Sequence, residues 1–132
     1  MKPLFAVLSL VALVVLFLTS CALNSGRYLD IAAQDIPIYP NADSVVQDGP
    51  SMNELDELYT WTFTTPDTPE MVWQYYKDEM GKRWGFYEPQ SNSFDKTLIV
   101  QSCPFYSINM TTSEITQSGQ EIMLHFRKQP CL

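Results

Sequence analysis

The sequence predicts an α+β domain in which an antiparallel sheet of about five to six strands carries one helix on one face. Residues 59–64 alternate aromatic residues with threonine, residues 68–81 hold the signals of one helix, and residues 105–128 hold two alternating runs around a turn. Strands, one helix and then an antiparallel run form the element order of an α+β sandwich.

The domain is expected to begin with an extended segment. Residues 36–43 alternate proline with apolar side chains, and proline favours extended backbone before it. We expect Ile38 and Tyr39 to pack on the core there. A short strand is predicted at residues 44–47, followed by a surface loop at residues 48–57, where glycine, proline and acidic residues gather.

The strongest strand signal follows this loop. Tyr59, Trp61 and Phe63 alternate with threonines, so that one face of the strand is aromatic and is predicted to face the core. Pro66 ends the strand, because proline cannot donate a hydrogen bond to a neighbouring strand.

A helix is predicted at about residues 68–81. Asp67 or Thr68 can cap its start, Pro69 suits its first turn, and Gly81 is expected near its end. A helical wheel places Val72, Tyr76 and Met80 at the centre of the apolar face and Met71, Trp73 and Tyr75 on its flanks.

Further strands are predicted after the helix. The candidates are residues 84–88, 96–102, 105–113 and 120–128. Apolar side chains alternate with polar ones in the last two runs, and the turn signal at residues 116–119 between them predicts an antiparallel hairpin.

The first twenty residues have the order of an export signal. Lys2 and the amino terminus are positive, residues 4–18 are uncharged and apolar, and Thr19-Ser20 provide small residues before Cys21. An uncleaved membrane helix is the alternative, since about 20 apolar residues suffice to span a bilayer.

The sequence Leu18-Thr19-Ser20-Cys21 resembles the lipobox of bacterial lipoprotein precursors. The resemblance implies that Cys21 takes a lipid on its thiol and becomes the first residue after cleavage. Acyl chains such as palmitate would then anchor the protein in the cell envelope, on the outer side of the cytoplasmic membrane or on the outer membrane. The implied organisation is a signal peptide at residues 1–20, a lipidated tether at 21–35 and a single domain at 36–132.

A second resemblance concerns the domain itself. The Tyr-Pro entry at residues 39–40, the Thr-Pro helix start at 68–69, the apolar helix face and the following Trp84 are similar to small domains of uncharacterised bacterial lipoproteins. This resemblance covers about residues 36–128 and contains no catalytic motif. The resemblance therefore bears on the fold of the domain and not on its function.

The charge of the chain bears on its partners. Without Lys2, the 112 residues from Cys21 onward carry seven Lys or Arg against fifteen Asp or Glu, a net charge of −8. We expect no nucleic-acid partner, because binding nucleic acid needs a cationic face. An acidic surface also repels anionic headgroups, so membrane attachment would depend on the lipid.

Three cysteines are an odd number for an exported protein. Lipidation of Cys21 would leave Cys103 and Cys131, which the predicted hairpin brings opposite each other, and a disulfide between them would persist outside the cytoplasm. Such a bridge would stabilise the domain by roughly 3.5 kcal/mol. Two reduced, unrelated thiols are the alternative.

We expect no catalytic site, no metal and no cofactor. His125, the one histidine, is predicted to face solvent on a strand, and a Ser-His-Asp arrangement would have no supporting motif around it. Glu54, Asp56 and Glu57 could offer oxygen ligands to calcium, but their spacing lacks the EF-hand pattern. A solvated acidic loop is the simpler interpretation.

Aromatic residues remain as the functional signal. Met71, Trp73 and Tyr75 are candidates for a partly exposed contact patch, because Met, Trp and Tyr are enriched at interfaces. The alternative is that the aromatic residues simply fill a core poor in leucine. The expected function is a non-enzymatic interaction or accessory module of the cell envelope, with the membrane and an envelope protein as partners. The competing prediction is a small-ligand binder with a pocket between helix and sheet.

Overall fold

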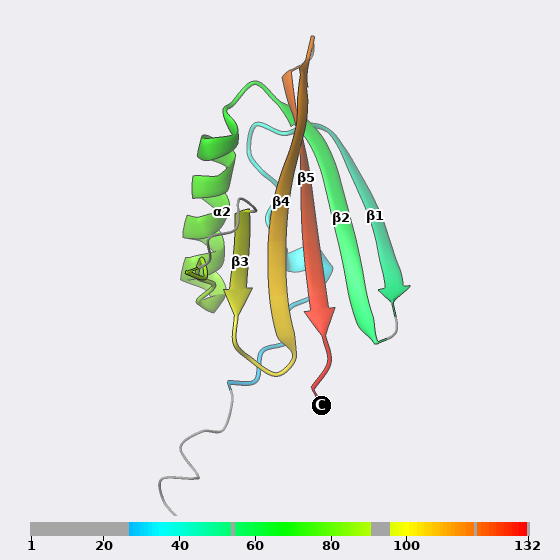
Figure 1. Ribbon diagram of the computed structural model, residues 1–132, viewed down its shortest axis with the longest axis vertical. Helices are drawn as coiled ribbons and strands as arrows, with labels where there is room; N and C mark the ends of the chain where they lie inside the picture. The colour runs from blue at the N-terminus through cyan, green and yellow to red at the C-terminus, as the bar shows by residue number, and fades with distance from the viewer. Residues whose placement is uncertain (1–26, 54, 91–95, 118, 132) are drawn as a thin grey trace, which may run out of the picture.

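The predicted fold class is confirmed. The computed structural model describes residues 27–53, 55–90, 96–117 and 119–131, with the backbone alone at 114–116. Within these residues one antiparallel sheet has the strand order β1-β2-β5-β4-β3, and one α-helix lies beside it (Figure 1). The elements are the 3-10 helix η2 (Ala33–Asp35), β1 (Asp43–Asn53), β2 (Asp56–Thr65), α2 (Pro69–Trp84), β3 (Lys96–Val100), β4 (Phe105–Thr116) and β5 (Gly119–Gln129).

The boundaries of α2 follow from its capping residues. The side chain of Thr68 accepts a hydrogen bond from the backbone N–H of Met71 at 3.4 Å, which satisfies one of the free donors at the helix start. The helix continues past the predicted end at Gly81 and stops at Trp84. Gly85 then adopts the left-handed conformation, with φ 77°, that commonly ends a helix.

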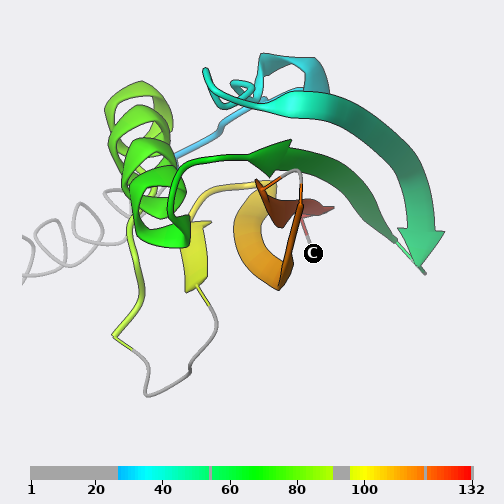
Figure 2. The same ribbon diagram turned by 90° about the horizontal axis from the view of Figure 1, so that it is seen from above.

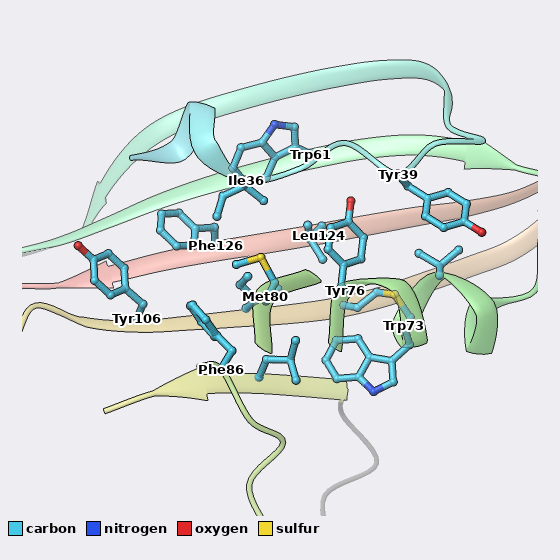
Figure 3. Packing of buried hydrophobic residues seen from close by; sticks show 14 of the residues in the cluster. Ile36, Tyr39, Trp61, Trp73, Tyr76, Met80, Phe86, Tyr106, Leu124 and Phe126 are labelled. Carbon is cyan, nitrogen blue, oxygen red and sulfur yellow. The ribbon is translucent and has the colours of Figure 1, made fainter. Parts of the chain in front are cut away.

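The core lies on one side of the sheet. Figure 2 shows α2 and the segment before β1 on this same side, whereas no described element covers the opposite face, here called the open face. Tyr76 and Met80 of α2 lie among side chains of β2 and β5 (Figure 3). The buried strand residues include Trp61, Phe63, Leu98, Tyr106, Ile108, Ile122, Leu124 and Phe126.

The segment before β1 belongs to the domain. Ile31 is 1% exposed and Ile36 is 5% exposed, and both lie in the main core cluster. The hydroxyl of Tyr106 donates to the carbonyl of Leu29 and accepts from the N–H of Ile31, both at 3.1 Å. Packed residues therefore begin before the predicted boundary at residue 36, because Leu29, Ile31 and Ala33 of the expected tether contact the core.

The first strand is longer than predicted. A strand at 44–47 and a loop at 48–57 were expected, but β1 runs from Asp43 to Asn53, pairs with β2 and is the first strand in the order of the described sheet. Its register shifts between Asp48 and Ser51, where Gly49 and Pro50 lie. An edge strand tolerates proline, since its outer N–H groups need no partner in the sheet.

The predicted strand at residues 84–88 is wrong. Trp84 is the last residue of α2, and in this stretch only Tyr87 pairs with the sheet, through two backbone hydrogen bonds of 2.9 Å to Ile99. The predicted hairpin is confirmed, because β4 and β5 pair antiparallel up to Thr116 and Gly119.

Candidate functional site

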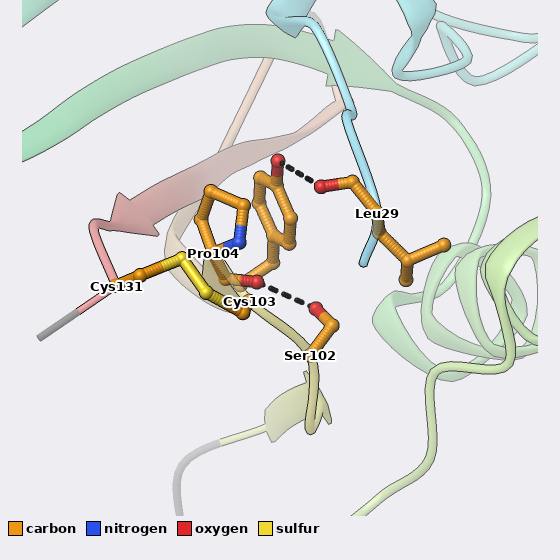
Figure 4. The surroundings of a disulfide bond; sticks show 6 residues. Leu29, Ser102, Cys103, Pro104 and Cys131 are labelled. Atoms are coloured by element: carbon orange, nitrogen blue, oxygen red, sulfur yellow. Dashed lines mark hydrogen bonds between the residues drawn. A yellow bond between two sulfur atoms is a disulfide. The ribbon is translucent and has the colours of Figure 1, made fainter. Parts of the chain in front are cut away.

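One end of the molecule gathers the turn between β1 and β2, the loop between β3 and β4 and the residues after β5 (Figure 1). We call it the disulfide end, because Cys103 and Cys131 are bonded there with a Cα–Cα distance of 5.3 Å (Figure 4). This is the pair that the cysteine count predicted. In the adjoining loop the hydroxyl of Ser102 donates to the carbonyl of Pro104 at 2.6 Å.

The chain enters the domain at the disulfide end. The N–H of Cys103 donates to the carbonyl of Arg27 at 3.1 Å, and Tyr28 forms a parallel bridge with Cys103. The hydroxyl of Tyr106 then holds Leu29 (Figure 4). The predicted lipidation site, Cys21, lies six residues before Arg27 and outside the described residues.

An open depression of about 480 Å³ lies at this same end. Its lining includes Leu55 of the turn between β1 and β2, Phe105 of β4 and both cysteines. A pocket was predicted between helix and sheet, where Val72, Tyr76 and Met80 of α2 are at most 1% exposed and belong to the core cluster. The depression therefore lies at a different place from the predicted ligand pocket.

The predicted contact patch is only partly exposed. Met71 is 54% exposed and Tyr75 is half-buried, but Trp73 is 6% exposed, so its predicted exposure is wrong. The indole Nε1 of Trp73 donates to Oε1 of Glu88 at 3.2 Å, and Nζ of Lys77 lies 3.0 Å from Oε2 of the same carboxylate. The chain after the helix folds back and covers this side of α2.

Ile38 is an exposed side chain near Tyr75 that the predicted contact patch did not include. Ile38 was expected in the core but is 57% exposed, because Tyr39 faces the core and successive side chains of an extended segment point to opposite sides. The hydroxyl of Tyr75 donates to the carbonyl of Ile38 at 3.4 Å. Met71 lies one helical turn before Tyr75. We call Ile38, Met71 and Tyr75 the helix-start patch.

Hydrogen bonds to Asp67 hold the helix-start patch in place. The Tyr39 hydroxyl donates to Oδ2 of Asp67 at 2.6 Å, and the Asn41 amide donates to the same oxygen at 2.8 Å. These two donors lower the pKa of Asp67. Burial, together with the neighbouring Asp67, raises the pKa of Tyr39 to about 12. The segment that carries Ile38 is thereby tied to the residue before the helix cap.

His125 lies on the open face, as predicted, but it is half-buried. Its Nδ1 is 3.0 Å from the hydroxyl of Thr60, and burial lowers the pKa of the imidazole. Register places Asp48, Thr60, His125, Asn109 and Thr97 in one row across the five strands. A hydroxyl beside a neutral imidazole can exchange a proton.

Acidic side chains near the turn between β1 and β2 are paired with other groups. Oδ2 of Asp56 accepts from the amide of Gln129 at 3.1 Å and lies 3.9 Å from Nε of Arg127, while Glu54 is outside the described residues. In the described part of the chain, no group of three or more His, Cys, Asp or Glu side chains is placed to hold a metal ion. Across residues 27–131, gaps aside, no helix is both long and apolar enough to cross a membrane.

Comparison with known proteins adds no relative. No family model matches the chain, and neither a curated protein nor a solved structure matches it.

Proposed function

We propose that the protein is a cell-envelope lipoprotein, anchored through Cys21, that acts as a non-enzymatic interaction or accessory module. The observation that carries the proposal is the placement of two features at opposite ends of the domain. The chain enters beside Cys103, at the end where the C-terminus also lies, whereas α2 begins at the other end (Figure 1). A lipid at Cys21 would leave the helix-start patch directed away from the membrane.

The disulfide supports the proposed location in the cell envelope. Disulfides persist outside the cytoplasm and are rare in reducing compartments. The bond between Cys103 and Cys131 leaves Cys21 as the third cysteine of the chain, which is the residue that the lipobox assigns to a lipid. The cysteine pairing and the export signal therefore support the same location.

The anchor is tested by intact mass. Protein from the membrane fraction is compared with a Cys21→Ala variant, with and without reduction and alkylation. The expected result is loss of residues 1–20 and an added acyl mass that the variant lacks, with two cysteines that alkylate only after reduction. A full-length, unmodified chain with free thiols would overturn the proposal.

The partner contact is tested by crosslinking in living cells. A photo-crosslinking amino acid at Met71 is compared with one at Gln74, which is also exposed on α2 but lies outside the helix-start patch. We expect Met71 to give a discrete crosslinked envelope protein, and we expect this product to disappear when Ile38→Asp is added. Equal products from both positions would argue against the patch as the contact.

A small-ligand binder is the second candidate, favoured by the depression at the disulfide end. A dye that binds apolar surfaces, such as anilinonaphthalene sulfonate, should then bind saturably at one molecule per protein. Leu55→Glu should abolish this binding, because Leu55 lines the depression, and Met71→Glu should leave it unchanged. Binding that both variants retain would exclude this site.

A further inference from the structure

We infer that the disulfide end is a membrane-contacting surface, occupied by the interfacial layer of the bilayer that carries the anchor. Tyr28, Met52 and Leu55 are the side chains that would enter this layer. The inference rests on the proposed lipid at Cys21 and adds to it a defined orientation of the domain.

The first argument is exposure at one end. Tyr28 is 72% exposed, Leu55 is 67% exposed and Met52 is 61% exposed. Tyr28 pairs with Cys103, and Leu55 lines the depression beside Cys103. Met52 pairs with Glu57 beside the turn that carries Leu55, so segments far apart in sequence bring these side chains to the same end. Single exposed apolar residues are ordinary, but apolar residues gathered on one surface mark an interaction site.

The second argument is the reach of the chain. Arg27 is held at the disulfide end by Cys103, and it is only the sixth residue after Cys21. Six residues span at most about 20 Å when fully extended, and a flexible chain of this length has a typical span of about 13 Å. A lipid at Cys21 would therefore keep this end of the domain next to the headgroups.

The third argument is charge. Asp30 lies 3.8 Å from Nζ of Lys128, and Asp56 lies 3.9 Å from Nε of Arg127, so basic groups offset these two carboxylates. Arg27 adds a further positive charge where the chain enters. Glu57 lies at the same end, opposite Met52 and Lys128, so among the described residues Arg27, Arg127 and Lys128 balance Asp30, Asp56 and Glu57. This end is therefore less repelled by anionic headgroups than the net charge of the protein implies. Tyr28 also suits the interface, because tyrosine is enriched at the headgroup level of membranes.

The experiment measures contact with acyl chains directly. The lipidated protein is prepared with Leu55→Cys or with Gln117→Cys, labelled with bimane at the new thiol and reconstituted into vesicles of phosphatidylethanolamine and phosphatidylglycerol. The vesicles contain lipids with or without bromine on the acyl chains, which quench bimane on contact. Gln117 is the matched control, because it is exposed in the turn between β4 and β5 at the opposite end (Figure 1).

We expect brominated lipids to reduce the emission at position 55 at least twofold and to leave position 117 unchanged. If the protein floats with the vesicles but brominated lipids change the bimane emission equally at positions 55 and 117, this inference is overturned and the lipid anchor is not. Protein that does not float with the vesicles would overturn the anchor and this orientation together. In a further outcome, brominated lipids do not quench the label at position 55 in vesicles, but the same label is protected from iodide quenching in native membranes. This result would overturn the inference and assign the disulfide end to a protein partner.

Discussion

The hydroxyl of Tyr106 accepts a hydrogen bond from the backbone N–H of Ile31, 75 residues earlier in the chain, at 3.1 Å. The same hydroxyl donates to the carbonyl of Leu29. One buried side chain of β4 thus satisfies two backbone groups of the segment before β1. These groups belong to none of the named strands, so the contact adds to the burial of Ile31 and Ile36 in holding this segment beside the core.

Removing this hydroxyl should loosen the segment. Tyr106→Phe leaves the N–H of Ile31 and the carbonyl of Leu29 without their partner, which typically costs about 1–3 kcal/mol in the free energy of unfolding. Urea unfolding measures the loss, and amide hydrogen exchange should accelerate at Ile31. Tyr28→Phe is the matched control, because Tyr28 is largely exposed. Equal stability of the two variants would contradict the assigned role.

Loss of the disulfide should destabilise the domain strongly. The bond closes a loop with a sequence separation of 28, and replacing both Cys103 and Cys131 by serine should cost about 2–4 kcal/mol. Urea unfolding compares this double variant with Cys21→Ala, which keeps the bond. A midpoint equal to that of the control would show that the bond contributes little.

Replacing either of two glycines near the end of α2 by alanine should change the stability of the protein, in opposite directions for the two positions. Gly81→Ala should stabilise the protein by about 0.5–1 kcal/mol, because Gly81 is helical and an added Cβ would lie 3.5 Å from the nearest atom, an ordinary contact. Gly85→Ala should destabilise it by about 1 kcal/mol, because Gly85 has φ +77°. Thermal unfolding of the two variants provides the measurement, and changes of the same sign would contradict the helix end described above.

His125 should titrate below its ordinary pKa of 6.5, because burial disfavours the charged imidazole. The folded protein then binds this proton less readily than the unfolded chain, so the stabilising contribution is present above about pH 6.5 and is lost as the pH falls through the folded pKa. As the protein has one histidine, NMR of its ring protons follows it without ambiguity. His125→Gln should lose this pH dependence, and a midpoint at or above 6.5 would contradict the assignment.

Tyr39→Phe should raise the pKa of Asp67, because the carboxylate loses the donor that lowers it most. Asp67 stabilises the fold above its unfolded pKa of about 3.8, and this contribution is lost as the pH falls through its lower folded pKa. Tyr39 itself favours the fold below pH 10, and this contribution is lost as the pH rises towards 12.

Carboxyl carbon shifts should show the change at Asp67 directly, and unfolding between pH 9 and 12 should be less pH-dependent in the variant. An unchanged pKa of Asp67 would show that Asn41 alone holds the carboxylate.

Sequence periodicity predicted the elements whose two faces differ. Trp61 and Phe63 alternate with threonines because β2 has one core face and one open face, and Val72, Tyr76 and Met80 repeat at helical spacing because one side of α2 is covered. The segment that carries Ile31 and Ile36 shows no such period. It is held by contacts with distant residues, which local sequence patterns do not record.

The helix-start patch could be predicted only in part for the same reason. A helical wheel describes a helix alone, so it could not show that Glu88 would return to cover Trp73. The exposure of Ile38 could have been found from sequence, because in an extended segment Ile38 and Tyr39 must face opposite sides. The predicted lipid site at Cys21 rests on sequence alone.

The way the chain enters the domain also determines how the protein would bear mechanical load. A pull on residue 27 acts first on the hydrogen bond between Arg27 and Cys103 and then on the contacts of Leu29 and Ile31 with Tyr106. Cys103 is covalently joined to Cys131, so tension that reaches this loop is shared with the end of the central strand β5. Drag on the domain would thus be resisted at a crosslinked point before any strand is peeled from the sheet.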